Sequence, residues 1–289
     1  MGKLLVIADL KGEGIATPRG LQLADKLNIE TEVVAFVHAP LGHLKVGKPE
    51  LEAIKAKLLK EREVEVQRRI DRNVRHGQKV SLIVVWEKDV AAWVTRQCAK
   101  GSYEMVVKTG RRSESLAHTS TDWQLLRECP APVVIVAEKK WSRTQPVMAS
   151  LDLGTDVPVK KKLNELILER AITLAEVLGV ELEIICAIEV PTLLADLDLV
   201  DPRVYVVDAK KDMEPLVSSL AKKFNLPEKS FTIKRGPVQK VITSQAAAKR
   251  AQLVVMGTVG RKGVKARLLG NTAEKVLRHL KTDVLALKP

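Results

Sequence analysis

The stretch ARLLGNTAEKVLRHLKTDVLALK, residues 266–288, has the pattern of a glycine turn, a short helix and a buried strand. A second version, SLAHTSTDWQLLRECPAPVVIVA, occupies residues 115–137, which is 266 − 115 = 151 positions earlier. The same offset relates VVAFVHAP at 33–40 to IICAIEVP at 184–191. A constant offset over separated segments indicates that the chain is an internal duplication.

Each half alternates short apolar strand patterns with helical patterns, the clearest of which are 51–75 and 160–178, and a further helix is predicted at 208–224. The strand patterns lie at 3–9, 33–40, 80–86, 105–110 and 132–137, and again at 146–152, 184–191, 230–236, 253–258 and 283–288. This alternation predicts right-handed crossovers and a parallel sheet covered on both faces. We therefore expect an α/β fold of two tandem Rossmann-like domains, each with a five-stranded parallel sheet flanked by helices.

The boundary between the halves is predicted at the polar stretch EKKWSRTQ, residues 138–145, which gives domains at 1–140 and 145–289. The length of 289 residues fits this division, because single cores usually stop growing at about 250–300 residues. Aromatic residues are only 3% of the chain, so the cores must be aliphatic.

The cysteines, the apolar runs and the net charge limit which classes of protein are possible. Cys98, Cys129 and Cys186 are far apart and form no C-x-x-C pair, which excludes a Cys-rich zinc module and predicts buried thiols of a reducing cytoplasm. No apolar run reaches the roughly 18–20 residues of a membrane span. The amino-terminal apolar run is too short for a signal peptide, so we expect a cytoplasmic protein. The net charge of +13 leaves a nucleic acid or anionic lipid partner open, although mixed-sign helices favour a solvated surface.

The predicted ligand edge of the second half carries a glycine-rich segment. Ligands of open parallel sheets bind at the carboxyl ends of the strands, and Asp152 and Ile188 end the first two strands of this half. The segment GTVGRKGVKARLLGNTAEKVL, residues 257–277, follows the fourth strand. Glycines let backbone N–H groups approach an anion, and a helix N-terminus carries partial positive charge. The segment is therefore suited to phosphate, and its basic residues could screen phosphate charge: Arg261, Lys262, Lys265 and Arg267.

The spacing of three glycines makes this signal more specific. Two residues separate Gly257 from Gly260, and nine separate Gly260 from Gly270. This matches neither the dinucleotide fingerprint nor the P-loop. It resembles G-2x-G-9x-G-[S/T/N], the ATP-binding signature of the universal stress protein family. The resemblance covers nearly the whole chain, once in each half. The chain as a whole resembles the tandem two-domain members of that family.

The resemblance implies a role for each matching position. Asp152 would contact the ribose or metal-bound phosphates, Ile188 would offer backbone hydrogen bonds to adenine, and Met256 would flank the base or ribose. The phosphates would be held by Gly257, Gly260, Gly270, Asn271 and Thr272. Asn271 stands where the family usually has Ser or Thr. The implied cofactor is ATP, with or without Mg²⁺. Structural roles stay open for Asp152 as a turn cap and for Thr272 as a helix cap.

The first half departs from this signature. Its loop, KTGRRSESLAHTSTDW, places Thr109 opposite Gly257 and Thr119 opposite Gly270, is three residues shorter, and keeps only Gly110. Asp9 is retained after the first strand. We therefore expect a degenerate site that does not bind ATP. A different anion could still meet a basic cluster there: Lys108, Arg111, Arg112 and His118.

No catalytic constellation is visible. The chain has no G-x-S-x-G, no H-E-x-x-H and no Walker lysine, so we expect no enzyme, with slow ATP hydrolysis left open. The five histidines lack the spacing of metal ligands, and we expect no metal site built by the protein alone.

Three functional hypotheses follow. The first is a stress-response regulatory protein that binds ATP or a related adenine nucleotide in its second domain without efficient catalysis. The second is a carrier or sensor of an apolar or lipid-like ligand, suggested by VPTLLADLDLVDPRVYVV, residues 190–207, which is long for a connection. The third is an RNA-associated protein with a basic surface, although no RNA-binding aromatic motif is present. The resemblance also implies an internal pseudo-dimer of the two halves, and a homodimer stays open.

Overall fold

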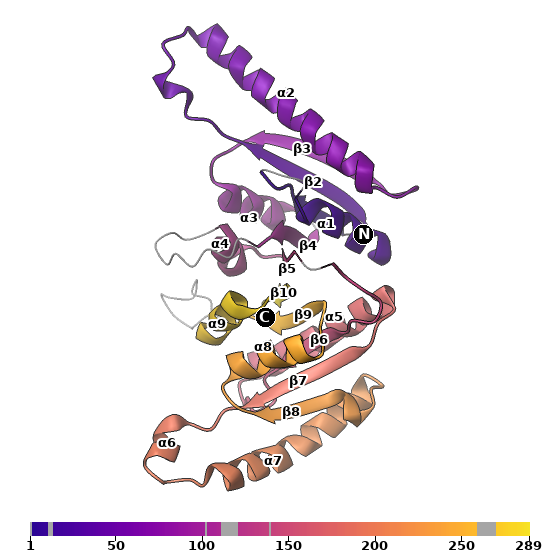
Figure 1. The fold of residues 1–289 in the computed structure, drawn as a ribbon, viewed down its shortest axis with the longest axis vertical. Helices are drawn as coiled ribbons and strands as arrows, with labels where there is room; N and C mark the ends of the chain where they lie inside the picture. The colour runs from indigo at the N-terminus through magenta and orange to yellow at the C-terminus, as the bar shows by residue number, and fades with distance from the viewer. Residues whose placement is uncertain (1, 11–13, 102, 111–120, 139, 259–269) are drawn as a thin grey trace. The chain divides into compact units, whose positions relative to one another are not determined.

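The computed structural model describes residues 2–10, 14–101, 103–110, 121–138, 140–258 and 270–289. The chain divides into two compact units, Met1–Ala137 and Glu138–Pro289 (Figure 1). Within the described residues no helix is both long and apolar enough to cross a membrane.

The first unit is a parallel sheet in the order β3-β2-β1-β4-β5. Its helices lie in two pairs, α1 beside α2 and α3 beside α4. The elements are β1 (Lys3–Ile7), α1 (Ala16–Leu27), β2 (Glu30–Val37), α2 (Lys48–Asn73), β3 (Val80–Trp86), α3 (Val90–Lys100), β4 (Tyr103–Thr109), α4 (Thr121–Glu128) and β5 (Val133–Val136). A short 3₁₀ turn, Leu41–His43, precedes α2.

The second unit repeats this order as β8-β7-β6-β9-β10, again with parallel pairing. Its elements are β6 (Val147–Leu151), α5 (Pro158–Leu178), β7 (Leu182–Ile188), α6 (Thr192–Asp196), α7 (Pro202–Lys223), β8 (Phe231–Arg235), α8 (Val238–Ala248), β9 (Leu253–Gly257), α9 (Asn271–His279) and β10 (Asp283–Leu287). The predicted α/β fold with a parallel sheet flanked by helices is confirmed in both units.

The cores are aliphatic, and the strands are buried on both faces. Leu4, Leu5 and Val6 in β1 are fully buried, and all five residues of β10 are buried. Continuous burial of this kind is characteristic of parallel sheets covered by helices. The three cysteines are buried free thiols, as predicted.

Helix ends and sheet register both show the duplication. The first helix of each unit ends in a left-handed residue, Asn28 in one and Gly179 in the other, and these are 179 − 28 = 151 positions apart. Two strand pairs occupy matching registers: Ile7 with Val34, and Ser150 with Ile185. Asp9 lies two residues after Ile7, and Asp152 lies two residues after Ser150. The two aspartates are therefore structurally equivalent.

The segment 190–207 corrects one expectation. It is not a long irregular connection, because it forms α6 and then the first turns of α7, which begins six residues before the predicted start at 208. The carboxylate of Asp201 accepts a hydrogen bond from the backbone N–H of Arg203 at 2.7 Å, and Pro202 is the first helical residue. Both are ordinary signals of a helix start.

Candidate functional site

The carboxyl edge of the second unit brings several predicted site residues together. The strand order reverses between β6 and β9, which is where open α/β sheets bind ligands. Asp152 follows β6, Ile188 ends β7, and Met256 and Gly257 end β9. On the far side of the loop, Gly270 directly precedes α9. Gly260 and the side chains of Asn271 and Thr272 lie outside the described residues.

Asp152 is positioned by a residue that the sequence analysis did not single out. The buried side chain of Asn164, on α5, accepts a hydrogen bond from the backbone N–H of Asp152 at 3.0 Å and donates one to its carbonyl at 2.8 Å. The carboxylate of Asp152 is 54% exposed and lies 3.0 Å from the ammonium of Lys160. Among the described residues it accepts no backbone N–H, so its turn-capping role is not supported. The backbone is fixed while the carboxylate faces solvent.

Ile188, at the end of β7, and Met256, near the end of β9, are apolar residues of this edge. Both side chains are almost completely buried. The carbonyl of Ile188 already accepts a hydrogen bond from the N–H of Gly236 at 2.9 Å. One lone pair of that carbonyl is therefore engaged within the protein, and the second remains for a ligand donor.

Cys186 lies beneath this edge, in β7. The pKa of its thiol is raised to about 11, mainly by burial and also by the nearby charge of Asp152, while a hydrogen bond from the backbone of Leu153 acts to lower it. Cys186 is a buried residue that packs beneath this edge.

Gly257 has a packing role that the glycine spacing did not reveal. A Cβ atom at this position would lie 2.5 Å from Cδ2 of Leu163 and 3.3 Å from Cδ1 of Ile167, both on α5. Glycine at this position therefore lets α5 pack closely on β9 without displacing Leu163, whether or not a phosphate binds there.

We expect Gly257→Ala to lower the free energy of unfolding by about 1–3 kcal/mol, because overpacking a tight helix–sheet contact forces neighbours to shift. Urea unfolding followed by circular dichroism measures this change. Gly154→Ala is the matched control, since its added Cβ would lie 3.2 Å from the flexible end of Met213. Equal stability of the two variants would contradict the packing role.

The equivalent edge of the first unit is built differently. The carboxylate of Asp9 accepts hydrogen bonds from the backbone N–H groups of Ile15 at 3.1 Å and Ala16 at 3.2 Å, which start α1. The hydroxyl of Thr109 accepts from the same Ala16 N–H at 3.0 Å. The carboxylate of Asp9 thus accepts backbone hydrogen bonds at the start of α1, whereas the described partner of the Asp152 carboxylate is the partly exposed ammonium of Lys160.

At the equivalent edge, the first unit has a buried ion pair where the second unit has apolar side chains. Register places Lys108 opposite Met256, and the 151-residue offset places Asp122 opposite Ala273. The ammonium of Lys108 contacts the carboxylate of Asp122 and donates a hydrogen bond to the carbonyl of Thr109 at 2.9 Å. The Lys108 and Asp122 side chains are only 12% and 11% exposed. The expectation that Lys108 is available to an anion was therefore wrong; Arg111, Arg112 and His118 lie outside the described residues.

Two buried arginines mark a second difference. The buried positions of α2 and α7 share one spacing and differ by 151, which pairs Arg62 with Met213 and Arg69 with Leu220. The carbonyl of Asp9 accepts hydrogen bonds from Arg62 at 2.6 Å and from Arg69 at 2.9 Å. The first unit thus holds the end of its first strand with guanidinium groups, where the second uses Asn164. Comparing the halves at the 151-residue offset could have revealed these exchanges of charged for apolar residues.

Comparison with known proteins agrees with this architecture. A model described as the universal stress protein family matches residues 157–288. Universal stress protein E of Salmonella typhi is 34% identical over 220 residues, which cover 74% of this chain and 70% of that protein. The universal stress protein E homolog of Haemophilus influenzae is 30% identical and matches 71% and 69% of the two chains.

Solved structures show the same fold. A putative universal stress protein from Pseudomonas aeruginosa superposes with a TM-score of 0.70 at 21% identity, over 99% of this chain and 93% of that one. A universal stress protein from Archaeoglobus fulgidus gives a TM-score of 0.68 at 20% identity, over 99% and 96%. The solved structures show the fold, and the sequence matches show that the chain belongs to the universal stress protein family.

Proposed function

We propose that the second unit binds ATP or a related adenine nucleotide and that the protein acts as a stress-response regulator without efficient catalysis. The observation that carries this proposal is the contrast between the two aspartates. Asp152 has a fixed backbone and an exposed carboxylate at the strand-order reversal. The carboxylate of Asp9 instead accepts hydrogen bonds from the backbone at the start of α1. Only the second unit keeps the three spaced glycines as well.

The geometry suggests how the parts of a nucleotide would be divided. The base would lie over Ile188 and Met256, with the second lone pair of the Ile188 carbonyl free for an amino group. The ribose hydroxyls would meet Asp152. The phosphates would lie at the start of α9, where unpaired backbone N–H groups and the helix dipole favour anions. Asn271 and Thr272 are in the first turn of that helix.

Mg²⁺ fits this arrangement as a companion of the phosphates. It prefers oxygen ligands and usually binds through one or two carboxylates together with phosphate groups. Asp152 supplies one such carboxylate. The metal would neutralise phosphate charge and fix the triphosphate conformation.

The same edge supports binding more than turnover. In the described part of the edge, the charged partner of Asp152 is Lys160, and no histidine or second carboxylate is hydrogen-bonded to it. A hydrolytic water would need a base within hydrogen-bond reach. Nucleotide occupancy, and not its hydrolysis, would then set the state of the protein.

A second candidate function is supported by an exposed apolar surface. Five aliphatic side chains along α6 and the start of α7 are more than half exposed: Leu193, Leu197, Leu199, Val204 and Val207. Exposed apolar patches of this kind mark interaction sites. They favour an apolar or lipid-like ligand of the second unit as the alternative to a nucleotide.

Titration calorimetry with ATP and Mg²⁺ on the full chain tests the proposal. We expect saturable binding near one nucleotide per chain, weakened more than about tenfold by Gly270→Val because a branched side chain at the helix start blocks close phosphate approach. Thr119→Val, at the corresponding position of the first half, is the matched control and should bind normally. No saturable binding to the wild type, or loss in the Thr119 variant, would refute a nucleotide site in the second unit.

A further inference from the structure

The second unit carries an exposed apolar surface that the proposed nucleotide site does not use. It lies on α6 and the first turns of α7, after the end of β7 (Figure 1). Leu193 and Leu199 on this surface are 68% and 65% exposed. Exposed apolar side chains gathered in this way are characteristic of a surface that another molecule covers.

The charge of this surface selects among the molecules that could cover it. Residues 189–199, here called the acidic segment, contain Glu189, Asp196 and Asp198 and no basic residue, so their formal charge is −3. All three side chains are exposed, and among the described residues none of them has an ion-pair partner. An anionic lipid headgroup would be repelled there. A basic partner that has apolar side chains of its own would be complementary.

The first unit offers such a partner at the equivalent place in the duplication. Residues 38–48, here called the basic segment, precede the acidic segment by 189 − 38 = 151 positions. They contain Lys45 and Lys48 and no acidic residue, which gives a formal charge of +2. Leu44 and Val46 in this segment are exposed as well. The same position of the duplicated fold is therefore apolar in both units but opposite in charge.

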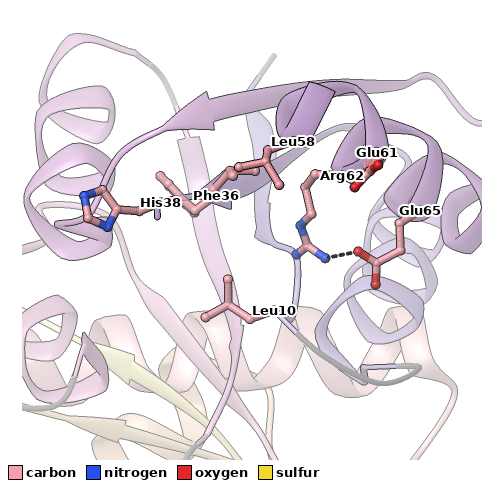
Figure 2. Close-up of a pocket in the computed structure, with 8 residues that line it drawn as sticks. Leu10, Phe36, His38, Leu58, Glu61, Arg62 and Glu65 are labelled. Carbon is pink, nitrogen blue, oxygen red and sulfur yellow. Dashed lines mark hydrogen bonds and ion pairs between the residues drawn. The ribbon is translucent and has the colours of Figure 1, made fainter. Parts of the chain in front are cut away.

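A hollow beside the basic segment is suited to receive an aliphatic side chain. Figure 2 shows this hollow between the end of β2 and α2, with Leu10, Phe36 and Leu58 around it and His38 just beyond the strand. Leu10 is 51% exposed, so this part of the first unit also presents apolar surface to solvent. An exposed leucine of a partner molecule would therefore meet apolar atoms there.

We infer that the acidic segment of one copy docks on the basic segment of a second copy of this chain. The carboxylates of the acidic segment face the two lysines, and the exposed leucines of α6 lie against Leu44, Val46 and the hollow. One contact between two short segments is small compared with the roughly 1,200–2,000 Å² of a standard interface. Each copy has one segment of each kind, so a twofold pair of copies makes the contact twice.

Sedimentation velocity of the full chain, over about a hundredfold range of concentration, tests the inference. We expect the wild type to pass from monomer to dimer as the concentration rises. Lys45→Glu combined with Lys48→Glu, the first charge reversal, should weaken dimerisation at least about tenfold, because like charges then face each other. This variant has a net charge of +9 where the wild type has +13, since each substitution removes two charge units. General repulsion between copies falls, so loss of the dimer would report the local contact.

The second charge reversal combines Glu189→Lys with Asp196→Lys and should weaken dimerisation in the same way. Asp198 is left unchanged because its φ of 51° lies in the left-handed region, which aspartate adopts more readily than lysine. In an equimolar mixture of the two reversals, a mixed pair has opposite charges at both of its contacts. We therefore expect the dimer to reappear on mixing. A contact within one chain, or a variant that has lost its fold, would not recover in this way.

Leu193→Ser combined with Leu199→Ser tests the apolar part of the contact and should weaken dimerisation at least about tenfold. Val157→Ser combined with Val159→Ser is the matched control, since these valines at the start of α5 are 42% and 43% exposed, and it should dimerise normally. Gly270→Val should also dimerise normally, which separates this inference from the nucleotide site. A wild type that stays monomeric would overturn the inference and leave the apolar surface to a lipid-like ligand. Unchanged dimerisation in either charge reversal, or a mixture of the two that stays monomeric, would overturn it as well.

Discussion

Asp122→Ala should lower the stability of the first unit by about 3–5 kcal/mol, because it leaves the buried ammonium of Lys108 without its carboxylate partner. The Lys108 and Asp122 side chains are about one-tenth exposed, so water cannot replace the lost partner. The remaining hydrogen bond from Lys108 to the carbonyl of Thr109 does not neutralise the charge. Breaking one half of a buried pair is therefore far more costly than losing a surface ion pair.

The second unit supplies the control for this prediction. Lys108→Met combined with Asp122→Ala installs the residues found at the equivalent positions, Met256 and Ala273. This double variant should recover stability to within about 1 kcal/mol of the wild type, since replacing a whole buried pair by apolar residues is often neutral.

Urea unfolding followed by tryptophan fluorescence measures both variants. Three of the four tryptophans, Trp86, Trp93 and Trp123, belong to the first unit, so the signal reports mainly on it. A double variant as unstable as Asp122→Ala would show that the ion pair itself holds the first unit together. It would also contradict the view that the pair stands in place of an apolar nucleotide edge.

Most of the fold could be predicted because it depends on patterns that are local in sequence. Continuous apolar strands such as Val133–Val136 and Asp283–Leu287 are buried wherever the sheet is covered by helices. Because of the 151-residue offset, an element predicted in one half could also be placed in the other half. The start of α7 was placed six residues late, although Asp201 and Pro202 gave a helix-start signal. The apolar character of the preceding residues outweighed that signal.

The candidate site was harder to predict because burial of a charged residue is decided by what packs against it. In KEREVEVQRRIDRN, Arg62 and Arg69 look like members of a solvated helix face, yet both are buried against the end of β1. Gly257 illustrates the converse case. Its spacing pointed to phosphate, while its close contact with α5 favours glycine for packing alone.

Asn164→Leu should lower the stability of the second unit by about 2–4 kcal/mol, since it leaves both the N–H and the carbonyl of Asp152 without their side-chain partner. Leucine has the same branched arrangement of side-chain heavy atoms as asparagine but a larger volume, so overpacking at this buried position adds to the loss. Lys160→Met is the matched control: it removes a partly exposed ion pair to the same Asp152 and should change stability by less than about 1 kcal/mol.

The same variant links stability to the proposed nucleotide site. If Asn164 holds Asp152 in position for the ribose, Asn164→Leu should also weaken ATP binding, measured by calorimetry at a temperature where the variant is fully folded. Asp152→Asn should weaken binding without the loss of stability, because the backbone contacts to Asn164 remain. Reduced stability with unchanged ATP affinity in Asn164→Leu would limit Asn164 to holding the end of β6. Reduced affinity in both variants would assign Asp152 to the ligand and Asn164 to its positioning.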